Sequence, residues 1–354
     1  MSAIEDYMIE NYIEKLDCPD EAERIYAAED LGYLNAPEGV PPLLEHLGKE
    51  TSRAVREAIF QALTRIDAAA AIEGSIQLLG SDDPQIRNQA VEVLRSKGQA
   101  SFPLLNTVMR EGGKDVRKLV LDVLSGVQVS GAEAIYEAAL SDQDANVVIT
   151  AVENLGKTRA TQFRSRIEDL LLADSHPMLV GACVEALVEI GQESSLAAIR
   201  RRFPDLPTAP DFFLASCLRA FAALGAGREF DEVARLLPAR GPHLRSAILS
   251  ALKAIYPRCT PLDPNQDLLT ALRALVENGD PPLCRYQAIR VLAFWAARED
   301  VCAFLVSCLS SPERLVRLGA AESLKVTERP GLESVFAAHV LKETDEEVLQ
   351  ALDC

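Results

Sequence analysis

Short motifs for catalysis or cofactor binding are missing from this sequence. None of the patterns HExxH, GxxxxGKS, GxxxxGKT or GxSxG occurs in its 354 residues. It therefore lacks the usual signatures of a catalytic zinc, a phosphate-binding loop or an activated serine. Its four histidines are far apart in the chain, and its eight cysteines include no CxxC pair. We expect neither a metal nor a cofactor and favour a protein without catalytic activity, with an enzyme kept as the alternative.

Long apolar runs are also missing. No stretch approaches the roughly 18 consecutive apolar residues that a membrane-spanning helix needs. The first residues, Met1 to Asp6, are acidic and do not resemble a secretory signal. Cys183, Cys217 and Cys284 occupy apolar positions of the repeat described below, where cysteine acts as a small hydrophobic residue. We therefore expect a cytoplasmic protein with no membrane partner.

Basic residues are in the minority. The chain has 36 lysines and arginines against 53 acidic residues, a formal net charge of −17. Binding many phosphates usually requires a broad basic face. The sequence therefore disfavours a nucleic-acid partner.

A helical pattern recurs along almost the whole chain. Ten apolar residues close the same pattern, at steps of 30 to 34 residues apart from a single step of 40. These anchors are Leu31, Leu63, Leu94, Leu124, Leu155, Leu187, Phe221, Leu252, Leu292 and Leu324. Four residues before each anchor stands a small or aliphatic residue, and eight before it the position is again mostly apolar. Spacings of four and eight place all three on one face of an α-helix, and a fixed period near thirty residues indicates stacked supersecondary units.

A second amphipathic segment precedes each anchor helix, and turn residues separate the two. Pairs such as Asp83-Pro84, Asp280-Pro281 and Ser311-Pro312 place proline where a new helix is expected to begin. The sequence predicts an all-α fold, an α-solenoid (superhelix) of about ten to eleven antiparallel helical hairpins. We expect one continuous solenoid over residues 1–354, with an insertion loop near residues 257–266 that is either a plain surface loop or a hinge.

The run Asp83-Pro84-Gln85-Ile86-Arg87, followed by Ala90-Val91 and Leu94, resembles the HEAT repeat, in the short form associated with phycobilisome lyases. Val316-Arg317, Ala320-Ala321 and Leu324 repeat the pattern. The resemblance implies an armadillo-like scaffold or adaptor, because such solenoids mostly bind proteins. It also implies an alternative, a phycobilin lyase or its non-catalytic subunit, although no residue here can be assigned a catalytic role from that family.

An arginine recurs one position after the first apolar residue of the pattern. The set is Arg24, Arg56, Arg87, Arg117, Arg245, Arg285 and Arg317. This position flanks the apolar face, so each guanidinium should be partly buried and should find carboxylate or carbonyl partners. We predict a structural ladder between adjacent repeats, with loop aspartates such as Asp20, Asp83, Asp115 and Asp280 as candidate partners.

The position opposite the apolar face is the candidate binding row. We expect it to line a concave groove that is acidic over the first six repeats and neutral or basic afterwards. The candidate partner-binding residues are Glu29, Glu92, Asp122, Glu153, Glu185, Arg219, Tyr286, Arg290 and Phe294. Tyr286, Arg290 and Phe294 lie on one helical face and form a candidate anchor of aromatic and cationic side chains. The acidic row could equally serve only solubility, and Phe294 could pack against the next repeat.

The favoured hypothesis is a non-catalytic scaffold that binds a protein or peptide partner, with basic segments preferred, in this groove. A phycobilin lyase-like protein and a nucleic-acid-binding solenoid are the alternatives. The sequence does not indicate the oligomeric state.

Overall fold

The computed structural model describes residues 3–259, 263–327 and 329–353, with the backbone alone for residues 3–5. Every regular element in this part of the chain is helical, and none of these residues forms a strand. The predicted all-α fold is confirmed. The chain divides into two compact units, residues 1–158 and 159–354, and each is described by itself. The single continuous solenoid stays a prediction.

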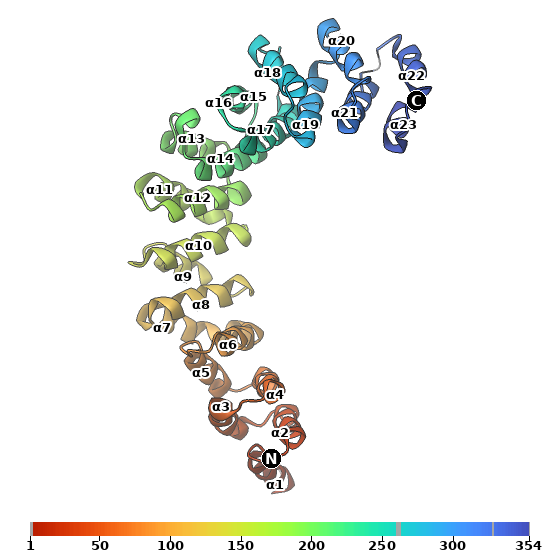
Figure 1. The fold of residues 1–354 in the computed structure, drawn as a ribbon. Helices are drawn as coiled ribbons and strands as arrows, with labels where there is room; N and C mark the ends of the chain where they lie inside the picture. The colour runs from red at the N-terminus through yellow and green to blue at the C-terminus, as the bar shows by residue number, and fades with distance from the viewer. Residues whose placement is uncertain (1–2, 260–262, 328, 354) are drawn as a thin grey trace. The chain divides into compact units, whose positions relative to one another are not determined.

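Unit 1 consists of helical hairpins in chain order (Figure 1). Its helices are α1 (Ala3–Lys15), α2 (Glu21–Tyr33), η1 (Pro37–Gly39), α3 (Val40–Lys49), α4 (Arg53–Arg65), α5 (Ala69–Leu78), α6 (Pro84–Lys97), η2 (Gly98–Ser101), α7 (Phe102–Glu111), α8 (Lys114–Ser125), α9 (Ala132–Ala139) and α10 (Ala145–Lys157). The second helices pack on one another in sequence, α2 on α4, α4 on α6, α6 on α8 and α8 on α10. This side-by-side stacking is the HEAT-type α-solenoid arrangement.

Unit 2 repeats the arrangement. Its helices are η3 (Thr161–Phe163), α11 (Arg164–Ala173), α12 (Pro177–Ile190), α13 (Glu193–Arg202), η4 (Leu206–Thr208), α14 (Asp211–Leu224), α15 (Gly227–Ala234), α16 (Leu236–Ala239), α17 (Pro242–Ile255), η5 (Tyr256–Arg258), α18 (Gln266–Glu277), α19 (Pro282–Leu292), η6 (Ala293–Trp295), α20 (Glu299–Cys308), α21 (Arg314–Lys325), α22 (Leu332–Val340) and α23 (Glu346–Leu352). Helices α12, α14, α17, α19, α21 and α23 pack in that order. The predicted insertion separates η5 from α18, and its residues 260–262 lie outside the described residues.

The ten anchor residues all lie in second helices, and none is more than 3% exposed. Their burial explains the period, because each second helix buries the same face between its own first helix and its neighbours. The repeat predicted from the sequence is therefore the unit of packing.

Helix starts follow the local chemistry of the turns. Asp83 accepts a hydrogen bond from the main-chain nitrogen of Gln85, and Pro84 is the first residue of α6, where its missing N–H costs little. Two predicted starts are displaced. Helix α19 begins at Pro282, one residue after Pro281, and α21 begins at Arg314, two residues after Pro312. The cap residue itself is non-helical, so a proline can precede the helix as well as open it.

A close approach between α2 and α4 depends on Gly32. A Cβ atom at this position would lie 2.8 Å from the Ala62 Cα and 3.1 Å from the Ala62 Cβ. Because the obstacle is backbone, we expect Gly32→Ala to lower the free energy of unfolding by about 1–3 kcal/mol. Gly48→Ala is the matched control, since no atom lies within 4 Å of a Cβ built there. It should raise the stability by about 0.4–1 kcal/mol. Urea unfolding followed by circular dichroism measures both, and equal effects would contradict the close approach.

Candidate functional site

The recurring arginines contact the loops between helices. In three of them, Nε donates to a carboxylate of the next hairpin and Nη1 donates to carbonyl groups of the preceding loop. Arg24 Nε donates to Glu50 Oε2 at 2.8 Å, Arg117 Nε to Asp142 Oδ2 at 2.8 Å, and Arg317 Nε to Glu343 Oε2 at 2.7 Å. The loop carbonyl acceptors are Cys18 and Pro19 for Arg24, Gly112 for Arg117, and Ser311 and Pro312 for Arg317.

The other four arginines vary. Arg56 has the same two kinds of partner with the nitrogens exchanged, since Nη1 donates to Asp83 Oδ2 at 3.0 Å and Nε donates to the carbonyl of Glu50 at 2.7 Å. Arg245 contacts Asp280. Arg285 donates to the carbonyl of Val276 at 2.8 Å, with Glu313 3.6 Å away. Arg87 donates to the carbonyls of Ser81 and Asp82. Two of the four predicted aspartates therefore meet a ladder arginine.

The other two aspartates have different partners. Asp20 caps α2 by accepting from the main-chain nitrogen of Ala22. Asp115 pairs with Lys118 at 2.8 Å, one turn away on α8. Both lie one turn or less from their partner in sequence, so the local contact forms in place of the contact between repeats.

Sequence reasoning missed Glu50, Asp142 and Glu343. Each stands 25 or 26 residues after its arginine, in the loop that leads into the next second helix. Each also accepts hydrogen bonds from main-chain nitrogens one or two residues further on. An acidic residue at that fixed distance after the arginine is the signal that would have found them.

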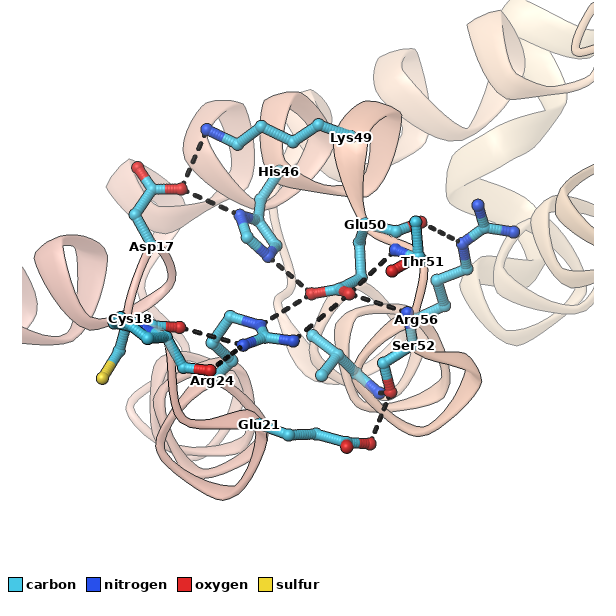
Figure 2. Close-up of polar contacts among 12 residues, drawn as sticks. Asp17, Cys18, Glu21, Arg24, His46, Lys49, Glu50, Thr51, Ser52 and Arg56 are labelled. Carbon is cyan, nitrogen blue, oxygen red and sulfur yellow. Dashed lines mark hydrogen bonds and ion pairs between the residues drawn. The ribbon is translucent and has the colours of Figure 1, made fainter.

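Glu50 is the centre of the polar network drawn in Figure 2. Its side chain is 4% exposed, and it accepts from Arg24, from His46 Nε2 at 2.9 Å, and from the main-chain nitrogens of Thr51 and Ser52 at 2.8 and 2.7 Å. Burial by itself would raise the pKa of Glu50, but these hydrogen bonds outweigh it and lower the pKa to about 2. His46 Nδ1 lies 3.1 Å from Asp17 Oδ1, so both ring nitrogens face carboxylates. The network ties the first hairpin to the second.

None of the predicted binding-row residues is buried. Glu92, Glu153 and Arg219 are exposed, and the remaining members are partly exposed. Several contact one another or a neighbour, however. Glu92 pairs with Arg95 at 2.5 Å, and Glu185 pairs with Arg219. Intramolecular pairing leaves these four charges less available to a ligand.

The predicted anchor of Tyr286, Arg290 and Phe294 is engaged within unit 2. The Tyr286 hydroxyl donates to Glu322 Oε2 at 2.7 Å, and Arg290 Nη1 lies 3.4 Å from the same carboxylate oxygen. Phe294 stacks on Tyr256 with ring centroids 3.8 Å apart. These contacts give each side chain of the trio a structural partner.

A groove of about 740 Å³ lies on unit 1. It is lined by Leu79, Gly80, Ser81, Asp82, Arg87, Gly113, Lys114, Asp115, Val116, Lys118, Leu119, Asp122, Thr150, Glu153, Asn154 and Lys157. Two members of the predicted row, Asp122 and Glu153, are brought together here. The lining carries as many basic as acidic side chains, which differs from the uniformly acidic surface expected from the row. The reason is that basic side chains outside the row also line the groove, namely Arg87 of α6, Lys114 and Lys118 of α8, and Lys157 of α10.

The described residues contain no group of three or more histidine, cysteine, aspartate or glutamate side chains placed to hold a metal. Burial raises the pKa of the Cys183 and Cys217 thiols to about 12, so both remain protonated near neutral pH. Cys354 lies outside the described residues. Within the described ranges, no helix is both long enough and apolar enough to cross a bilayer.

Comparison with known proteins agrees with this geometry. A family model for HEAT repeats matches residues 9–95. Residues 9–95 therefore contain HEAT repeats. Over 71 residues the chain is 39% identical to the bilin biosynthesis protein PecE of Mastigocladus laminosus. That match covers 20% of this chain and 26% of PecE, and it is consistent with the short lyase-type repeat.

Solved karyopherin structures share the fold. A structure of Kap95p binding to RanGDP superposes with a TM-score of 0.64 and 12% identity, over 98% of this chain and 56% of that one. The karyopherin Kap121p matches with a TM-score of 0.60 and 14% identity, over 99% of this chain and 45% of that one. The chain thus spans about half the length of these solved structures. At such identities the likeness shows the fold alone.

Proposed function

We propose that this HEAT-repeat chain is a non-catalytic scaffold that binds a protein or peptide partner, with basic segments preferred. The unit 1 groove is the observation that carries the proposal. Its Glu153 carboxylate is exposed and meets no cation among the described residues, and Asp122 has only the side-chain amide of Asn154 at 3.5 Å. Arg87 and Lys157 line the same groove, but within the described ranges neither is paired with these two carboxylates, which therefore favour a cationic partner. The karyopherin Kap121p is described bound to the SUMO protease Ulp1p, which supports protein binding as a use of this fold.

Charge reversal of the acidic row tests the proposal. The variant changes Glu92, Asp122, Glu153 and Glu185 to lysine, and the probe is a phage-displayed library of random peptides of about ten residues, which span roughly 35 Å when extended. We expect the wild-type protein to enrich peptides and the variant to bind the enriched peptides about tenfold or more weakly, with a smaller dependence on salt.

The matched control reverses four exposed glutamates of first helices in unit 1, Glu73, Glu111, Glu133 and Glu137. It changes the net charge equally, so it separates groove contacts from the overall field of the protein. Equal loss in both variants, or no enrichment by the wild type, would contradict the groove assignment.

A phycobilin lyase-like activity is the second candidate, and the similarity to PecE is the observation that favours it. The purified protein, incubated with a linear tetrapyrrole and an apo-phycobiliprotein, should produce no change in the absorbance spectrum if the scaffold proposal is right. A time-dependent spectral shift that requires the protein would favour the lyase instead.

A further inference from the structure

We propose that Asn278 is a site of spontaneous modification, at which ring closure onto the main-chain nitrogen of Gly279 converts the asparagine to aspartate and isoaspartate. The isoaspartate product breaks the contact between Arg245 and Asp280. The reaction needs only water, and it does not depend on the proposed binding function.

Asn278 and Gly279 form an exposed turn that follows α18. The chain has eight asparagines, and only Asn278 is followed by glycine. Both residues of the turn are exposed. The hydrogen-bond ladder of α18 ends at Asn278, whose N–H donates to the carbonyl of Ala274. Within the described part of the chain, neither the Gly279 N–H nor the Asn278 side chain has a hydrogen-bond partner. Both reacting groups are therefore free.

Glycine removes the main obstacle to ring closure. Gly279 has a φ of 77°, in the left-handed region that glycine adopts at little cost. No side chain stands beside the attacking nitrogen, and no other atom lies within 4 Å of the place that a Cβ would take. The nitrogen can therefore approach the side-chain carbonyl carbon of Asn278.

The reaction forms one bond and breaks another in each of two steps. The nitrogen of Gly279 bonds to Cγ of Asn278, and the side-chain nitrogen leaves as ammonia with the proton that Gly279 gives up. Water then opens the cyclic imide at either carbonyl. Opening at Cγ gives aspartate, and opening at the main-chain carbonyl of Asn278 gives isoaspartate, so the net change is water in and ammonia out.

Asn265 provides the contrast within unit 2. It is also exposed, but its side chain accepts a hydrogen bond from the main-chain nitrogen of Asp267 and caps α18. Gln266 follows it, so the next main-chain nitrogen carries a side chain beside it. Exposure alone therefore does not make an asparagine of this chain reactive.

The isoaspartate product alters the segment that leads into α19. Its main chain runs through the former side chain and is longer by one methylene group. Pro281 and Pro282 follow closely, and their fixed φ angles leave little freedom on that side, so the displacement falls on Asp280. The Asp280 side chain is 9% exposed and contacts Arg245 of α17. Isoaspartate should break this ladder contact, whereas the aspartate product keeps the normal main chain.

Peptide mass spectrometry of the full-length protein, incubated in mildly alkaline buffer, tests the reaction. We expect Asn278 to convert about tenfold or more faster than Asn265, with isoaspartate among the products, because only Asn278 has a free side chain followed by glycine. Asn278→Gln should stay unmodified at this position, since its longer side chain disfavours the same ring. Equal conversion of Asn278 and Asn265, or no conversion of Asn278, would overturn the proposal.

Urea unfolding followed by Trp295 fluorescence tests the consequence, since Trp295 lies in unit 2 and is 5% exposed. The incubated wild type should lose stability in proportion to its isoaspartate content and approach the loss caused by Asp280→Asn. Fresh Asn278→Asp and incubated Asn278→Gln should unfold like the fresh wild type, and enzymatic repair of isoaspartate to aspartate should restore the urea midpoint. An unchanged midpoint after incubation, or an equal loss in Asn278→Asp, would overturn the link to the Arg245 contact.

Discussion

Glu50→Gln is expected to lower the free energy of unfolding of unit 1 by about 3–5 kcal/mol. The substitution keeps the shape of the side chain but removes the charge that faces Arg24 Nε at 2.8 Å and His46 Nε2 at 2.9 Å. It also turns an amide NH₂ toward groups that can only donate, because the main-chain nitrogens of Thr51 and Ser52 bond to the same carboxylate. The variant leaves the mostly buried Arg24 guanidinium without its carboxylate partner.

Urea unfolding followed by circular dichroism, with hydrogen exchange of the amides of α3 and α4, measures the effect. The single tryptophan, Trp295, lies in unit 2, so its fluorescence does not report on this change. Glu45→Gln is the control, since Glu45 is exposed on the same helix α3. It should change the stability by less than about 0.5 kcal/mol. Similar values for the two variants would show that the network contributes little.

The same carboxylate makes stability depend on pH. The pKa of Glu50 is lowered from 4.5 to about 2 in the folded chain, so its stabilising contribution is complete above pH 4.5 and is lost as the pH falls toward 2. The contribution amounts to about 3 kcal/mol. Glu50→Gln should therefore reduce the loss of unfolding free energy that unit 1 shows as the pH falls from 4.5 to about 2. Arg317 likewise lowers the pKa of Glu343 to about 2, so unit 2 should still lose stability at acid pH in this variant.

Phe221→Ala should lower the stability of unit 2 by about 3–5 kcal/mol. Phe221 is the anchor of its repeat and is 0% exposed, so truncation removes a large apolar side chain and leaves a cavity between packed helices. Phe212→Ala is the matched control on the same helix, α14. Phe212 is 57% exposed and lies near Gly181 and Phe213, so its loss should cost less than about 1 kcal/mol.

Trp295 fluorescence follows this pair of variants during urea unfolding, because Trp295 lies in unit 2 and is 5% exposed. The two substitutions remove the same side chain from one helix, so helix propensity cancels between them. If both lowered the urea midpoint equally, the assignment of the buried face from the repeat would be wrong.

Only part of the site could be predicted from the sequence. The exposure of Glu92 and Glu153 follows from helical periodicity, because the rotation of 100° per residue relates each position to the apolar face. Periodicity is less reliable at the edge of that face. Phe213 stands eight residues before the anchor Phe221, on the predicted apolar face, yet it is partly exposed while Leu214 beside it is fully buried.

Helical periodicity could not predict which exposed side chains contact one another within the chain. Arg290 and Tyr286 both contact Glu322, and Arg95 contacts Glu92. Such contacts depend on the separation of neighbouring helices and on side-chain rotamers. The mixed charge of the unit 1 groove arises in the same way, since residues from loops and helix ends enter it.

The sequence by itself determined the helical hairpin, its period and the face that each second helix buries, because these depend on the local spacing of apolar residues and turn residues. Only the tertiary structure decided that Glu50, Asp142 and Glu343 meet the arginines. These contacts join residues 25 or 26 positions apart. Their formation depends on how adjacent hairpins are placed, which a one-dimensional pattern does not specify.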